Sequence, residues 1–90
     1  MKNLYVLTEN NRELAGLVCD GSILILLQDA VYLLTETPAI LEQRGIDTYV
    51  FEADARERGM EESLPPSAQR VDYPELVQLL MDRDHRVINL

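Results

Sequence analysis

Apolar positions along this chain form two kinds of pattern, continuous runs and stripes at helical spacing. The longest run is 23–27, where five apolar residues follow one another without a polar interruption. A strand of this kind is covered on both faces and belongs in the centre of a sheet. Shorter strands are predicted at 2–7, 47–52 and 70–73. Residues 85–90 predict either a short edge strand or an ordered tail.

The first helical pattern lies at 8–21, between the first strand and the central run. Thr8 or Asn10 is placed to cap this helix, and Gly21 is placed to end it. Three of its apolar residues recur at helical spacing: Leu14, Leu17 and Val18. We therefore expect a helix that packs this stripe against the sheet.

Three short helical segments are predicted after the central run. The first covers 29–34, with Asp29 as the expected N-cap. The second runs from about 38 to 44, begins with a proline near its first turn and ends at Gly45. The third consists of one or two turns within 53–59 and is closed by a glycine.

The rest of the chain predicts one loop and one longer helix. Pro65 and Pro66 forbid regular structure within 60–69. The helix at 74–84 begins with Pro74 at a first-turn position. We expect this helix to bury an apolar face made of Leu76, Val77, Leu79, Leu80 and Met81.

The alternation of strands and helices predicts the fold class. It is typical of an α/β domain with three layers, α/β/α, around a mainly parallel sheet of four or five strands. The chain has 90 residues, of which 47% are hydrophobic and 27% charged, and this suits one domain spanning 1–90. Because a domain this small buries only a modest share of its surface, we expect partner chains.

Charge and hydropathy exclude several classes of partner. The chain has sixteen acidic and eight basic side chains, which gives a formal net charge of −8. Affinity for nucleic acid is built largely on Lys and Arg, so we expect no direct nucleic-acid binding. The N-terminal sequence lacks the apolar core of about 7 to 15 residues that marks a signal peptide. No apolar run approaches the roughly 18 residues of a membrane span, so we expect a cytoplasmic protein without membrane contact.

Polar residues at the end of the central strand are the candidate site. Gln28 and Asp29 lie where α/β folds commonly place ligands, at the carboxyl end of a strand. Asp29 is either a functional carboxylate or a helix cap, and we expect the cap because local geometry alone explains it. Together with Tyr32, these residues form the candidate binding or interface group. The sequence has no Gly-rich phosphate loop and no telling Ser, His and Asp arrangement, so we expect no cofactor.

Cysteine and histidine offer little further chemistry. Cys19 is the only cysteine, so no disulfide and no cysteine zinc cluster can form within one chain. Asp82, Asp84 and His85 follow a predicted helix, where such residues rarely converge on one ion, so we expect no metal site. Cys19 falls at a predicted helix end beside Asp20, and neither the helix dipole nor the carboxylate favours a thiolate there. We expect a small buried residue without a catalytic role.

Three stretches of the sequence together resemble the DsrH/TusB family of small sulfur-relay proteins. They are LLQDAVY at 26–32, YVFEADARERG at 49–59 and VDYPELVQL at 71–79. Members of this family have a Leu-Gln-Asp-Gly-Val-Tyr-like strand end, then a strand followed by Asp and, shortly after, Arg-Gly. An Asp-Tyr step leads into their last helix. The order and spacing of the three blocks fit the family over residues 22–79.

The chain departs from the family pattern in three places. Ala30 replaces the usual Gly, Glu57 stands where a small residue is common, and the tail 88–90 lacks the Trp of many members. Some members carry a cysteine in the first helix, and alignment places Leu14 at that position. Cys19 lies five residues later, so it should not inherit a sulfur-carrying role.

The resemblance implies a DsrE/DsrF/DsrH-like α/β fold and a cytoplasmic assembly of several subunits. In such assemblies persulfide sulfur passes between cysteines of other subunits and carrier proteins, serving 2-thiouridine formation in tRNA or sulfur oxidation. The chain is then expected to be a non-catalytic subunit. Its expected partners are DsrE/DsrF (TusD/TusC)-like subunits.

Two other functions are compatible with the same residues. One is a stand-alone homo-oligomeric binding module of this fold, in which Gln28, Asp29 and Tyr32 line a ligand pocket. The altered tail keeps this alternative open. The other is a sulfurtransferase that carries persulfide on Cys19, which the expected helix-end position opposes.

Overall fold

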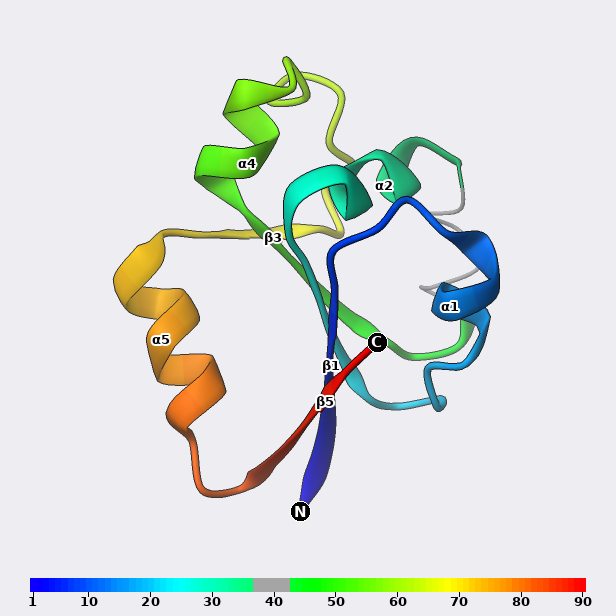
Figure 1. Ribbon diagram of the computed structural model, residues 1–90, viewed down its shortest axis with the longest axis vertical. Helices are drawn as coiled ribbons and strands as arrows, with labels where there is room; N and C mark the ends of the chain where they lie inside the picture. The colour runs from blue at the N-terminus through cyan, green and yellow to red at the C-terminus, as the bar shows by residue number, and fades with distance from the viewer. Residues whose placement is uncertain (37–42) are drawn as a thin grey trace.

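The chain forms one five-stranded sheet in which every neighbouring pair of strands is parallel. A computed structural model describes residues 1–36 and 43–90. The strand order across the sheet is β4-β3-β2-β1-β5, so β2 is central (Figure 1). The strands are β1 (Lys2–Leu7), β2 (Ile23–Leu26), β3 (Asp47–Phe51), β4 (Gln69–Val71) and β5 (His85–Asn89). The predicted α/β fold with a mainly parallel sheet is confirmed.

Short helices connect the strands. They are α1 (Arg12–Gly16), the 3₁₀ helix η1 (Gln28–Tyr32), α2 (Leu33–Glu36), α4 (Glu52–Glu57) and α5 (Tyr73–Met81). Most of the helix predicted at 38–44 lies outside the described residues. The glycine predicted to close the 53–59 segment does so, because Gly59 follows α4 with a φ of 66°, a conformation that few other residues adopt readily.

Strand β2 is buried on both faces, as its apolar run predicts. Ile23 and Ile25 belong to one core cluster, and Leu24 and Leu26 belong to the other. None of these four side chains is more than 5% exposed. Successive side chains of a strand point to opposite faces, so a run without polar residues needs a covering layer on each side.

The two faces of the sheet are covered unequally. On one face, Ile23 and Ile25 pack with β1 residues and with Leu76 of α5. On the other face, Leu24 and Leu26 pack with residues of α1, η1, α2 and α4. Figure 1 shows α5 on one side of the sheet and α1 and α2 on the other. Among the described helices, α5 is the only one that covers its face.

The first helix is shorter than the sequence predicts. It ends at Gly16, well before Gly21, and its cap is Asn11, whose side chain accepts hydrogen bonds from the two N–H groups of Glu13 and Leu14. Thr8 and Asn10 are not the cap. The expected stripe is also broken, because Leu17 lies beyond the helix and is 63% exposed.

The last helix begins within one residue of the predicted start but ends at Met81, before the predicted end at residue 84, and its apolar face is only partly buried. Asp72 and Glu75 form a reciprocal capping box at its start. Leu76 is buried and Leu79 and Leu80 are half-buried. The prediction that Val77 and Met81 are buried is wrong: they are 38% and 77% exposed. The sheet covers only part of the apolar surface of α5, so the remaining apolar side chains stay exposed.

We expect the substitution Ile25→Ala to lower the free energy of unfolding by about 2 to 5 kcal/mol. The Ile25 side chain is fully buried between β2 and the α5 layer, and truncation leaves a cavity there. The matched control Leu17→Ala removes an exposed apolar side chain and should cost no more than about 0.5 kcal/mol. Urea unfolding of both variants is the measurement. Equal losses would contradict the burial of Ile25 beneath α5.

Candidate functional site

The chain makes a strained turn at the carboxyl end of β2. Gln28, the first residue of η1, has a φ of 52°, which is a left-handed conformation that costs a non-glycine residue of order 1–3 kcal/mol. Its backbone N–H donates a hydrogen bond of 2.7 Å to Asp54 Oδ2 in α4. Because Asp54 is 26 residues away along the chain, a tertiary contact holds this turn in place.

Asp29 is bound to an arginine and does not cap a helix. The N-cap of η1 is Leu27, which makes no side-chain capping bond, so the predicted capping role of Asp29 is wrong. Arg58 Nε donates to Asp29 Oδ1 at 2.9 Å. The Asp29 side chain is 67% exposed, whereas that of Arg58 is only 20% exposed. The Asp29 carboxylate is therefore exposed at the surface, and it accepts a hydrogen bond from the Arg58 guanidinium, which is largely buried.

Arg58 joins the two loops that meet at this edge. Its Nη1 donates to the backbone carbonyl of Asp54 at 3.2 Å and lies 3.8 Å from Asp54 Oδ1. The hydrogen bond to Asp29 raises the pKa of Arg58 above its ordinary value. We call Gln28, Asp29, Asp54 and Arg58 the carboxyl-edge cluster. It can bind and orient a polar partner, and it contains no thiol.

The structure brings together two of the three site residues that the sequence suggests. Gln28 and Asp29 are both exposed at the carboxyl end of β2. Tyr32 is partly buried and packs against the core cluster on the α1 and α2 side. Asp54 and Arg58 were not predicted as site residues. Their four-residue separation on a helix was the available signal, because it places both side chains on one face.

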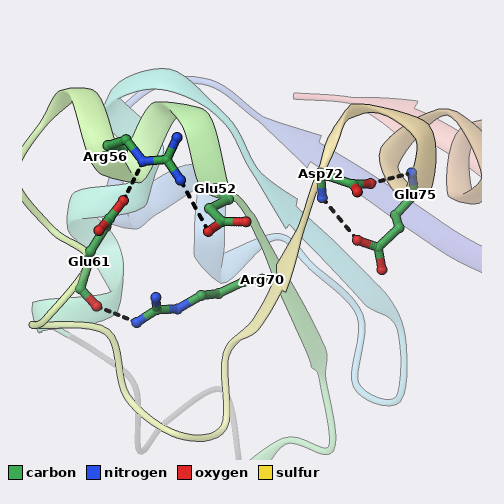
Figure 2. Close-up of polar contacts among 6 residues, drawn as sticks. All are labelled: Glu52, Arg56, Glu61, Arg70, Asp72 and Glu75. Carbon is green, nitrogen blue, oxygen red and sulfur yellow. Dashed lines mark hydrogen bonds and ion pairs between the residues drawn. The ribbon is translucent and has the colours of Figure 1, made fainter.

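A second polar group extends this edge towards α5 (Figure 2). Arg56 Nε donates to Glu61 Oε1 at 2.6 Å, and Arg56 Nη2 donates to Glu52 Oε1 at 3.3 Å. The bond to Glu61 raises the pKa of Arg56 above its ordinary value. Arg70 of β4 donates to the carbonyl oxygen of Glu61. Beside Arg56 lies a shallow depression of about 300 Å³, lined by Phe51, Glu52, Ala53, Arg56, Asp72 and Tyr73.

Cys19 lies apart from this edge. It follows α1 and precedes β2, so it lies near the amino end of the strand, whereas Gln28 follows the carboxyl end. The four residues of β2 separate these ends by roughly 13 Å. The expected burial of Cys19 at a helix end is wrong, because the residue is exposed beyond α1. The hydroxyl of Tyr5 donates to its Sγ at 3.2 Å.

The predicted solvated end after α5 makes contacts with the rest of the fold. Nδ1 of His85 lies 2.9 Å from the carbonyl oxygen of Leu79, which ties the start of β5 to α5. Asp82 and Asp84 are exposed. Within residues 1–36 and 43–90, no group of three His, Cys, Asp or Glu side chains is placed to hold a metal ion. No helix in the same residues has the length and apolar content to cross a membrane.

We expect Asp54→Ala to lower the free energy of unfolding by about 1 to 2 kcal/mol, because it removes the acceptor that holds the strained Gln28 turn. Asp54→Asn keeps an acceptor oxygen and should cost less than about 1 kcal/mol. Thermal or urea unfolding of both variants is the measurement. If Asn and Ala are equally damaging, the charge of Asp54 matters and the backbone hydrogen bond does not.

We expect Tyr5 to ionise at higher pH than an ordinary tyrosine. The hydrogen bond to Cys19, and secondly burial, raise the pKa of Tyr5 above the ordinary value of about 10. The protonated form is thus favoured in the folded state, and stability should fall as pH rises above about 10 towards the raised pKa. Ultraviolet titration of the wild type, Tyr5→Phe and Cys19→Ala is the measurement. Cys19→Ala should lower the pKa of Tyr5, and an unchanged titration would contradict the hydrogen bond.

Comparison with known proteins agrees with the family resemblance of the stretches at 26–32, 49–59 and 71–79. A search of curated proteins found no match. The model of one protein family, described as DsrH like protein, matches residues 6–86, which include the whole carboxyl-edge cluster and α5. The match also includes the three stretches on which the resemblance rests. The chain belongs to the DsrH-like family.

Proposed function

We propose that this protein is a non-catalytic subunit of a cytoplasmic sulfur-relay complex. In such a complex persulfide sulfur passes between cysteines of DsrE-like and DsrF-like subunits and carrier proteins, serving 2-thiouridine formation in tRNA or sulfur oxidation. Membership of the DsrH-like family supports the sulfur-relay part of the proposal. The non-catalytic part rests on where the family's motif residues lie relative to Cys19.

The main support for the proposal is that two of the family's sequence stretches, 26–32 and 49–59, meet in the carboxyl-edge cluster. This cluster contains no thiol. Asp29 of the first block is bound to Arg58 of the second, and Asp54 of the second holds the backbone of Gln28. The third stretch, 71–79, contains the start of α5. Its Tyr73 lines the depression next to Arg56, beside the same edge. A persulfide carrier is expected to have its cysteine among such residues, whereas Cys19 follows α1 at the other end of β2.

The described surroundings of Cys19 supply neither a helix N-terminus nor a free cation to activate a carrier thiol. Reactive cysteines usually lie at helix N-termini or beside free cations. Cys19 follows the C-terminal end of α1. The nearby guanidinium of Arg44 donates hydrogen bonds to Asp20, at 2.7 Å, and to the carbonyl oxygen of Val18, so it is not a free cation. Exposure alone makes Cys19 accessible without making it nucleophilic.

The proposal predicts that this chain does not accept persulfide sulfur. The protein is incubated with a cysteine desulfurase, free cysteine, the upstream carrier and the relay subunits, and intact masses are measured. We expect no added sulfur, about 32 Da, on this chain under conditions that load the partner subunit. Cys19→Ser should support relay activity at the wild-type rate.

Two results would contradict the proposal in different ways. A stoichiometric persulfide on Cys19, with relay activity lost in Cys19→Ser while the complex still assembles, would make the chain a sulfurtransferase. Purification at native expression that recovers only copies of this chain would favour the stand-alone binding module. The proposed subunit role requires DsrE-like and DsrF-like chains to be recovered with it.

A further inference from the structure

Three apolar side chains of α5 are exposed in a line along the helix. Tyr73, Val77 and Met81 are 68%, 38% and 77% exposed. They are spaced four residues apart, and residues at this spacing lie on the same side of a helix. We call these three residues the α5 stripe. It lies beside the part of the helix that Leu76 buries against the sheet, so the apolar side of α5 is wider than the surface the sheet covers.

The described chain leaves this stripe without a covering element. Among the described helices, α5 is the only one on its face of the sheet (Figure 1). Val87 of the edge strand β5 pairs with Leu4, which belongs to this face, and is 39% exposed. Tyrosine and methionine are enriched in the cores of protein interfaces. A helix whose exposed side carries both, at the spacing that helix-binding grooves recognise, has the form of an interface anchor.

Charges around the stripe select the kind of partner. Within 72–84 the acidic residues are Asp72, Glu75, Asp82 and Asp84, and the only basic residue is Arg83. The helix itself contains no Lys or Arg. A second copy of this chain, with a net charge of −8, would bring the same sign of charge to the contact. Like charges across an interface oppose binding, so the complementary surface is one with a basic border.

We propose that the α5 stripe is the surface through which this protein binds a partner subunit, and that the partner presents an apolar patch bordered by Lys and Arg. The inference rests on the proposed role as a subunit of a relay complex and names the surface used. Tyr73 also lines the depression beside Arg56, so the stripe continues into the carboxyl edge where the three motif blocks meet. One partner can therefore contact both.

The experiment compares two single substitutions that add one negative charge to the same exposed helix. Met81→Glu places the charge in the stripe, and Gln78→Glu places it on the polar side. Binding to the purified DsrE-like and DsrF-like subunits of the same organism is measured by calorimetry, with thermal melts to verify folding. We expect Met81→Glu to weaken binding at least about tenfold and Gln78→Glu to weaken it less than about threefold.

A third variant and a salt series separate the apolar contact from the charged border. Tyr73→Ala removes apolar area without adding charge and should also weaken binding by about tenfold or more. Raising the salt concentration should weaken the wild-type complex, because attraction between the acidic border and a basic partner is screened. Wild-type binding that does not respond to salt would overturn the assignment of a basic border.

The outcomes distinguish this inference from the proposed function. If the relay subunits bind the wild type and all variants equally, the stripe is not the interface, but the subunit role stands. If the relay subunits do not bind the wild type, both fail. If the purified chain instead self-associates in light scattering, and Met81→Glu abolishes that association, the occupant is a second copy and the assignment to a basic partner is overturned.

Discussion

Burial of β2 on both faces is the constraint on which the rest of this structure depends. The strand is apolar at every position, so it must lie at the centre of the sheet with helices on each side. The described helices that supply those layers are short. Four of them share one face, and α5 alone covers the other among the described residues. The single helix over the second face leaves apolar side chains at the surface.

The same constraint creates the carboxyl-edge cluster. β2 and β3 are neighbours in the sheet and run parallel, so the loops after these two strands meet at one edge. The chain leaves β2 through Gln28 in a left-handed conformation, and Asp54, in the helix after β3, accepts the freed N–H group. Arg58 then joins Asp29 to the carbonyl of Asp54. Two motif blocks that are far apart in the sequence become one surface because their strands are neighbours.

Much of the fold could be predicted from the sequence because its signals are local. The apolar run identified the central strand, and Pro74 and Gly59 marked the start of one helix and the end of another. The role of Asp29 could not be predicted, since its partner Arg58 is 29 residues away and a cap was the simpler local explanation. The exposure of Met81 was also missed: periodicity shows that a helix side is apolar, but not whether another element covers it.

Hydrogen–deuterium exchange on this protein, alone and with its relay subunits, tests the central claim most directly. That claim separates the partner-binding surface, which is α5 with the edge beside it, from the single thiol. We predict slower exchange on complex formation across 69–84 and no change across 17–22, the segment around Cys19. Protection of 17–22 with 69–84 unchanged would contradict the account, because the partner would then engage the thiol and not the α5 surface.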